Sequence, residues 1–170
     1  MFSKGQLVVY GGEGVCRVEE IGVPSIAGAD KTRQYYTLLP LHRSGQVLTP
    51  VDTKVLMRPV MSREEAEALI RGLPALEAET LPGGGVRTAK EFYHNLVMSY
   101  DCHRLAGMIK AVRQKRLRAL QRGKKVSQLD ERYLKRAEDE LYGELAAALS
   151  LERDQVVDYI RQSCPDWAEN

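Results

Sequence analysis

The residues of this chain that could perform acid–base, nucleophilic or metal chemistry are few and widely spaced. His42, His94 and His103 occur singly, without the short histidine spacings of a metal site. Cys102 and His103 are adjacent, so on a helix their side chains diverge by about 100° and are poorly placed to hold one ion. The sequence contains neither a G-x-S-x-G element nor a nucleotide-binding fingerprint. We therefore expect no enzyme, no cofactor and no metal, with a redox or metal enzyme centred on Cys102 and His103 as the remote alternative.

A glycine-rich stretch near the N-terminus has to be weighed as a phosphate-binding loop. Gly11-Gly12-Glu13-Gly14 lacks the lysine and hydroxyl residue that close such a loop, and a strand-like run comes after it instead of a helix. The stretch separates the apolar runs 7–10 and 15–18, which is typical of a β-hairpin whose turn needs positive φ angles. We interpret it as a hairpin turn.

Charge is distributed unevenly along the chain. Residues 102–129 contain nine Lys or Arg and no acid, whereas residues 130–170 contain five basic and eleven acidic residues. On the helix expected over 102–122, four of the cations fall within a band of about 60°. With two lysines in the next turn, the candidate contacts to a polyanion are Arg104, Lys115, Arg118, Arg122, Lys124 and Lys125. The band either tracks the phosphates of a nucleic acid or is a solvated face that pairs with the acidic helix after it.

The N-terminal third is rich in β-forming residues. Five short runs with glycine and proline between them predict a small SH3- or Tudor-like β-barrel, formed by residues 7–10, 15–18, 35–39, 46–49 and 55–60. A domain of this size is too small for a deep catalytic pocket, and usually presents an edge or a groove to a partner.

The rest of the chain has helical patterns, so the fold class is α+β with a C-terminal compact all-helical bundle. Capping residues predict the helix starts: Ser62 with Glu65, Thr88 with Glu91, Asp101, Ser127 and Ser150. Inward positions of the helix 102–122 include Leu105, Met108, Ile109, Val112 and Leu120. The predicted domains are residues 1–61, a short helix with a Gly- and Pro-rich linker over 62–87, and a helical domain over 88–170.

The sequence also bears on location. No apolar stretch is long enough to cross a bilayer, and Met1–Lys4 does not begin a signal peptide, so we expect a cytoplasmic protein. Cys16, Cys102 and Cys164 form no C-x-x-C pair and are expected to be reduced thiols.

Short motifs along nearly the whole chain resemble those of the CarD/CdnL family of bacterial transcription regulators. The matching segments are Met1-Phe2, Gly5, Val8-Val9-Tyr10, Gly14-Val15, Val18, Ile21, Tyr35-Tyr36-Thr37-Leu38, Thr49-Pro50-Val51-Asp52, Met57-Arg58-Pro59-Val60, Phe92-Tyr93-His94-Asn95-Leu96 and Glu144-Leu145-Ala146. The resemblance implies a Tudor-like domain, shared with transcription-repair coupling factors, that binds the β subunit of RNA polymerase. It also implies a helical domain that rests on promoter DNA and stabilises the open complex.

The resemblance also assigns candidate contacts. The positions of the family's polymerase contacts are held here by Ser25, Ile26, Ala27, Gly28, Val47, Leu48 and Thr49, and Lys90 matches a basic DNA-facing position. Thr88 occupies the place of the tryptophan with which the family wedges DNA, and the only tryptophan is Trp167. The resemblance therefore supports polymerase binding more strongly than contact with the promoter DNA backbone. The expected protein is a monomeric, nucleoid-associated regulator, and the alternative is an adaptor of the same fold that never touches DNA.

Overall fold

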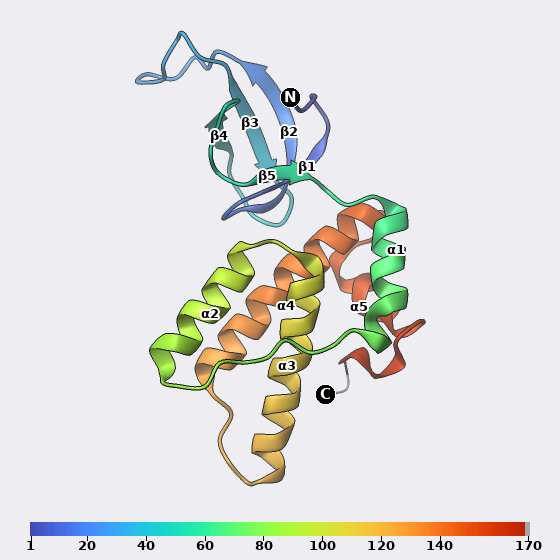
Figure 1. The fold of residues 1–170 in the computed structure, drawn as a ribbon. Coiled ribbons are helices and arrows are strands. Elements are labelled where there is room, and N and C mark those ends of the chain that lie inside the picture. The colour runs from blue at the N-terminus through green and yellow to red at the C-terminus, as the bar shows by residue number, and fades with distance from the viewer. Residues whose placement is uncertain (169–170) are drawn as a thin grey trace. The chain divides into compact units, whose positions relative to one another are not determined.

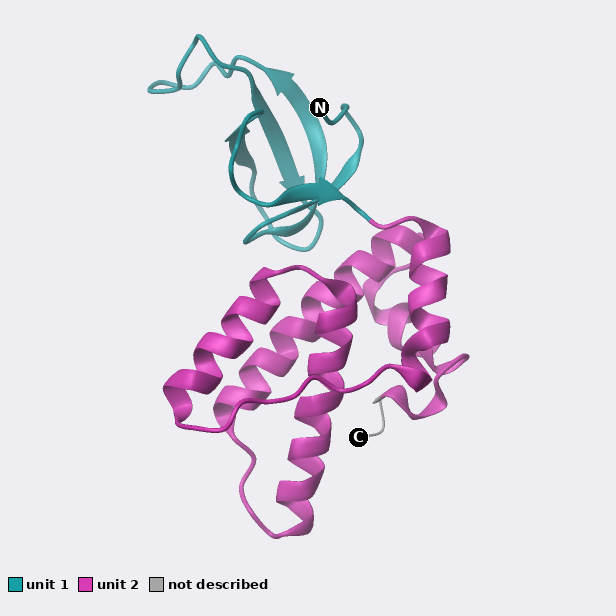
Figure 2. Cartoon of the chain, viewed as in Figure 1, with its two compact units in different colours: residues 1–60 teal, residues 61–170 magenta. Residues whose placement is uncertain are grey.

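The computed structural model describes residues 1–168. The chain forms two compact units, residues 1–60 and residues 61–170 (Figure 2). No helix within the described part is long and apolar enough to cross a membrane.

The first unit is a single antiparallel sheet. Its strands are β1 (Leu7–Tyr10), β2 (Gly14–Gly22), β3 (Tyr35–Pro40), β4 (Val47–Pro50) and β5 (Met57–Pro59), in the order β4-β3-β2-β1-β5 (Figure 1). The five predicted strands form one sheet, but the predicted barrel is not closed, because β4 and β5 lie at opposite edges of the sheet and do not pair with each other. Both edge strands are short and end in a proline, which cannot donate a hydrogen bond to a further strand.

The first hairpin has the turn that its glycines predicted. Val9 pairs with Val15 and Tyr10 with Gly14, and the turn places Gly12 at φ +90° and Gly14 at φ +77°. Such angles are costly for residues that carry a Cβ. The hydrophobic core cluster of this unit comes from alternate strand positions and comprises Val8, Tyr10, Cys16, Val18, Tyr36 and Leu38.

The second unit is helical. It contains α1 (Arg63–Gly72), α2 (Val86–Met98), α3 (Cys102–Gln121), α4 (Gln128–Leu149) and α5 (Val156–Arg161) (Figure 1). Three of the predicted caps are confirmed. Ser62 and Glu65 form a reciprocal capping box, the Asp101 carboxylate accepts hydrogen bonds from two backbone N–H groups of α3, and the Ser127 hydroxyl accepts one from α4. Each satisfies backbone donors that a helix start leaves unpaired.

Two other predicted helix starts are wrong. Gly85 is the N-cap of α2, without a side-chain hydrogen bond, so Thr88 lies inside the first turn of that helix. The helix can begin earlier because the glycines before Val86 allow the chain to turn there, as the φ of +107° at Gly84 shows. Ser150 ends α4 in a left-handed conformation, and α5 begins only at Val156, after a 3₁₀ turn.

The segment between α1 and α2 packs against α3. The backbone N–H of Glu79 donates to the carbonyl of Gly107 at 3.0 Å. Lys110 Nζ donates to the carbonyl of Leu76 at 2.8 Å and also to that of Leu73. Leu76 and Leu81 pack on the buried core of the unit. These contacts position α3 against a stretch that the sequence presents as a linker.

Candidate functional site

The four cations predicted to form one band on α3 have different surroundings. Arg104 Nε lies 3.2 Å from a carboxylate oxygen of Glu79, and Lys115 Nζ lies 2.7 Å from a carboxylate oxygen of Asp130. Within residues 1–168, Arg118 and Arg122 are exposed and make no ion pair. Arg104 and Arg122 are also about 27 Å apart along the helix, at a rise of about 1.5 Å per residue. The structure therefore divides the band into two engaged and two available cations.

Asp130 is the buried centre of the contact between α2, α3 and α4. It is only 4% exposed, and its carboxylate accepts a hydrogen bond from the Tyr93 hydroxyl at 2.8 Å as well as the ion pair from Lys115. Burial, together with the hydrogen bond to Asp130 and its negative charge, raises the pKa of Tyr93 well above its ordinary value of 10.0. Lys115 thus neutralises a buried acid and is a structural residue.

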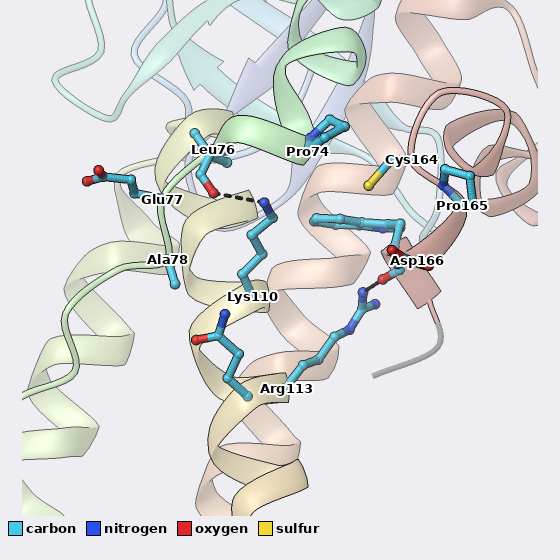
Figure 3. A pocket seen from close by; sticks show the side chains of 11 residues that line it. Pro74, Leu76, Glu77, Ala78, Lys110, Arg113, Cys164, Pro165 and Asp166 are labelled. Atoms are coloured by element: carbon cyan, nitrogen blue, oxygen red, sulfur yellow. Dashed lines mark hydrogen bonds between the residues drawn. The ribbon is translucent and has the colours of Figure 1, made fainter.

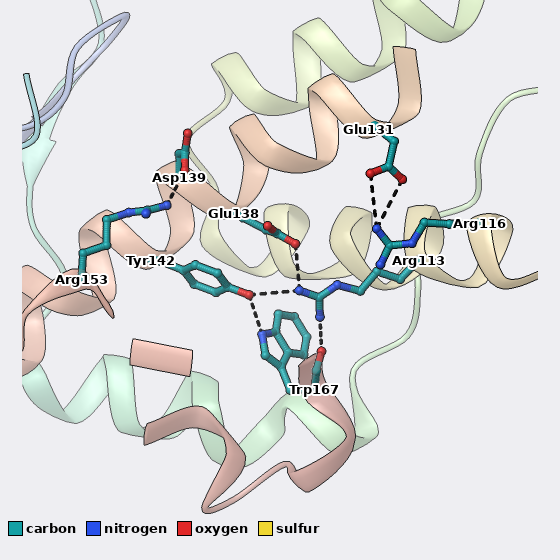
Figure 4. A network of polar contacts seen from close by, with 8 residues as sticks. All are labelled: Arg113, Arg116, Glu131, Glu138, Asp139, Tyr142, Arg153 and Trp167. Atoms are coloured by element: carbon teal, nitrogen blue, oxygen red, sulfur yellow. Dashed lines mark hydrogen bonds and ion pairs between the residues drawn. The ribbon is translucent and has the colours of Figure 1, made fainter. Parts of the chain in front are cut away.

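Two further cations of α3 also pair with α4. Arg113 Nη2 donates to Glu138 at 2.8 Å, and Arg116 lies 3.3 Å from Glu131 (Figure 4). Pairing with the following helix, which the sequence left open as the alternative to anion binding, is thus the arrangement at Lys115, Arg113 and Arg116.

Arg113 also fixes the C-terminal segment. Its guanidinium lies 5.0 Å from the ring centroid of Trp167 and donates to the Trp167 carbonyl (Figure 4). Trp167 is 3% exposed, and its indole N–H donates to the Tyr142 hydroxyl at 2.9 Å. The single tryptophan is therefore a core residue of the second unit.

A cavity of about 520 Å³ lies beside this tryptophan (Figure 3). It is bordered by the segment 74–78, by α3 and by residues 164–167. The two cations that line it, Lys110 and Arg113, donate to backbone carbonyls and to Glu138. No buried polar side-chain atom in the described part of the chain lacks a hydrogen-bond partner. The cavity therefore offers a ligand no buried polar group that is still unpaired.

The last residues of α3 are exposed to solvent. Leu120, predicted to face inward, is 58% exposed, and Leu117 is 41% exposed. The prediction of Leu120 is wrong because Arg116 already pairs with Glu131, in the first turns of α4, so α4 has few residues left to cover the last turn of α3. The exposed end of α3, which we define as residues 117–121 together with the C-cap Arg122, and the turn after it carry the available cations Arg118, Arg122, Lys124 and Lys125. Lys90 is exposed on α2.

A pair of arginines on α4 was missed by the sequence analysis. The guanidinium carbons of Arg132 and Arg136 lie 5.6 Å and 5.5 Å from the centroid of the Tyr133 ring, and both side chains belong to exposed residues. They were not predicted because acidic residues outnumber basic residues in the segment 130–170. The spacing Arg-Tyr-x-x-Arg, which places both cations next to one aromatic ring on a helix, could have revealed them.

In the first unit, the predicted contacts fall on one loop and one edge strand. Residues 25–28 are exposed in the loop after β2, where Ile26 is 59% exposed. Val47 and Leu48 are half-buried on β4, whereas Thr49 is 2% exposed and its hydroxyl accepts a hydrogen bond from Tyr10. Thr49 supports the sheet, so its side chain is not available to a partner.

The loop and the edge strand meet at one end of the sheet. Tyr35, at the end of the loop, pairs with Gly22 of β2 and with Pro50 of β4. Arg33 in the loop and Asp52 after β4 form an ion pair of 2.5 Å. Since β4 pairs only with β3 in the described sheet, its other side presents unpaired backbone groups beside this loop.

The cysteines and histidines do not gather into a site. Cys16, Cys102 and Cys164 are buried and unpaired with one another, as expected of reduced thiols, and Cys102 Sγ lies 3.0 Å from a carboxylate oxygen of Glu144. Within the described residues no three potential metal ligands come together.

Comparison with known proteins concerns the first unit. Residues 2–61 match the sequence model of the CarD-like/TRCF RID domain. The match spans the whole sheet and ends where α1 is about to begin. No curated protein matches the chain.

Proposed function

We propose, on the premise that residues 2–61 form a CarD-like/TRCF RID domain, that this protein is a transcription regulator that docks on RNA polymerase through its first unit. The family match is the observation that carries the proposal, because the domain is named for its interaction with RNA polymerase. The subunit of RNA polymerase that it would bind is the β subunit, as the resemblance of the sequence implies.

The first unit has a surface suited to such docking. One side of β4 is unpaired, and an edge strand can bind by adding to a partner's strand through backbone hydrogen bonds. Ile26 supplies an exposed apolar side chain on the loop whose end Arg33 ties to Asp52, after β4. Backbone pairing would give affinity, and Ile26 and Leu48 would give selectivity.

The second unit would contact promoter DNA without reading its sequence and so modulate open-complex formation. Exposed, unpaired cations at the end of α3 support this part of the proposal, since contacts to phosphates carry no sequence information. Thr88 lies in the first turn of α2 and has no apolar ring to insert between bases, so a role in holding the duplex is favoured over a role in wedging it open. We propose no enzymatic activity.

The second candidate is an adaptor of the same fold that binds polymerase or another protein and leaves DNA untouched. The engagement of Arg104 and Lys115 with Glu79 and Asp130 favours it, since two of the predicted DNA contacts are already neutralised.

The decisive experiment is a binding titration of the full chain against purified RNA polymerase core enzyme and, separately, its β subunit. We expect saturable binding to both. A chain that binds neither would exclude polymerase docking, and with it both the regulator and an adaptor that binds polymerase. Duplex DNA binding, measured in parallel, separates the regulator from the adaptor.

A further inference from the structure

Arg132 and Arg136 differ in their surroundings from Lys135, the third cation of α4. Lys135, between them in sequence, lies 3.3 Å from Asp139, and Arg153 also pairs with Asp139. Within residues 1–168 neither Arg132 nor Arg136 makes an ion pair, and each guanidinium lies against the ring of Tyr133.

The spacing of this pair is unfavourable for the isolated helix. Like charges four residues apart on a helix repel each other and destabilise it. The Tyr133 ring offsets this cost, since a cation near an aromatic ring is attracted to the face of the ring.

The ring holds both guanidinium groups in place. Tyr133 is 4% exposed and is itself packed against Tyr93 of α2, with ring centroids 5.5 Å apart. Two arginines whose guanidinium groups lie against one fixed ring have less freedom to lose when they bind an anion than two free surface side chains. Their planar donor groups match phosphate oxygens.

We propose that Arg132 and Arg136 form a phosphate clasp for the backbone of duplex DNA. This inference rests on the DNA contact of the proposed function and relocates part of it, from the α3 band predicted by the sequence to α4. The clasp is joined by the available cations at the end of α3, which the short turn between the helices connects to the start of α4. Two separated groups of unpaired cations in one unit fit an extended polyanion better than a single small anion.

The test compares two variants of the full chain that lose the same net charge. Arg132→Gln/Arg136→Gln removes the clasp. Lys135→Gln/Arg161→Gln removes two exposed cations that have carboxylate partners, Asp139 and Asp158, in the structure. Both are titrated with a fluorescent DNA duplex over a range of salt concentrations. We expect the clasp variant to bind about tenfold more weakly at low salt and the slope of log K against log salt to fall by about 1.8, which is two phosphates at about 0.9 each. The control should keep the wild-type slope.

Three outcomes would overturn the clasp. Equal slopes for the clasp variant and the control would show that only net charge matters. Competition by inorganic pyrophosphate at concentrations too low to act as general salt would indicate a site for a free phosphate ion. A wild-type chain that binds no DNA would exclude the clasp while leaving polymerase docking, measured separately, intact. The thermal unfolding midpoint of the clasp variant should stay close to that of wild type, because the substitution removes the like-charge repulsion and the two contacts with the Tyr133 ring together. A purely structural role predicts a lower midpoint with unchanged DNA binding.

Discussion

The hydroxyl of Tyr93 donates a hydrogen bond of 2.8 Å to a carboxylate oxygen of Asp130. Asp130 is almost fully buried, so this bond connects α2 to a negative charge at the start of α4 that Lys115 of α3 also contacts. Three helices therefore depend on one carboxylate for their relative positions. Buried charges of this kind are costly to leave without partners, and this one has two.

The first prediction concerns pH. Because the pKa of Tyr93 is higher in the folded chain than its ordinary value of 10.0, the folded state keeps a proton that the unfolded chain releases. The stabilisation is complete below pH 10 and is lost as the pH rises above it, by at most about 1.4 kcal/mol per pH unit. Urea unfolding between pH 8 and pH 11 should show a smaller loss for Tyr93→Phe than for wild type. The control is Tyr159→Phe, which removes a tyrosine hydroxyl that lies 3.3 Å from Glu67. If stability falls with pH as steeply in Tyr93→Phe as in wild type, Tyr93 does not cause the pH dependence.

The second prediction separates stability from binding on α3. Lys115→Gln should lower the free energy of unfolding by about 1–2 kcal/mol, because it removes a positive partner from the buried Asp130 carboxylate. Arg118→Gln should leave stability within about 0.5 kcal/mol of wild type, because its side chain is exposed and unpaired. DNA affinity should fall more in Arg118→Gln than in Lys115→Gln. Chemical denaturation and DNA titration of both variants test this, and a Lys115→Gln protein of wild-type stability with weaker DNA binding would contradict it.

The third prediction concerns Gly107 within α3. Glycine to alanine inside a helix normally stabilises by about 1 kcal/mol. Here a Cβ would lie 3.2 Å from the Glu77 carbonyl oxygen and 3.1 Å from Glu79 Cγ, where the segment before α2 crosses α3. We expect Gly107→Ala to lower the unfolding free energy by about 1–2 kcal/mol. Thermal or urea unfolding measures it, and stabilisation would show that the segment does not press on α3.

The fourth prediction concerns polymerase docking. Ile26→Asp should weaken binding to the polymerase β subunit at least tenfold, because it places a charge at an exposed apolar position of the loop whose end meets β4. Leu41→Asp is the matched control, since Leu41 is also exposed and comes after β3, at the opposite end of the sheet from the loop before that strand. Surface plasmon resonance with the full chain distinguishes them, and equal losses in both variants would move the docking site elsewhere.

Local signals in the sequence predicted those parts of the fold that depend on a few neighbouring residues. Ser62, Asp101 and Ser127 were identified as caps because a capping side chain bonds to N–H groups only two or three residues away. Thr88 and Ser150 have the same chemistry, yet the helices begin elsewhere, because glycines before Val86 and the left-handed turn at Ser150 set the chain direction.

The candidate sites depended on partners distant in sequence, which periodicity does not supply. Arg104 is engaged by Glu79, and Leu120 is exposed because of where α4 begins. Sheet closure likewise depends on whether β4 and β5 meet, and no property of either run alone determines that. The arginine pair beside Tyr133 was local, but the net acidity of its segment concealed it.

An open sheet can aggregate through its edge strands, and the sequence of these strands limits this. Two free edges could recruit the same strand from another copy and begin aggregation. However, β4 has four residues and ends in Pro50, while β5 has three and ends in Pro59, so neither edge offers a long uninterrupted row of backbone donors. The sheet can therefore accept a short strand from a chosen partner while remaining a poor template for copies of itself.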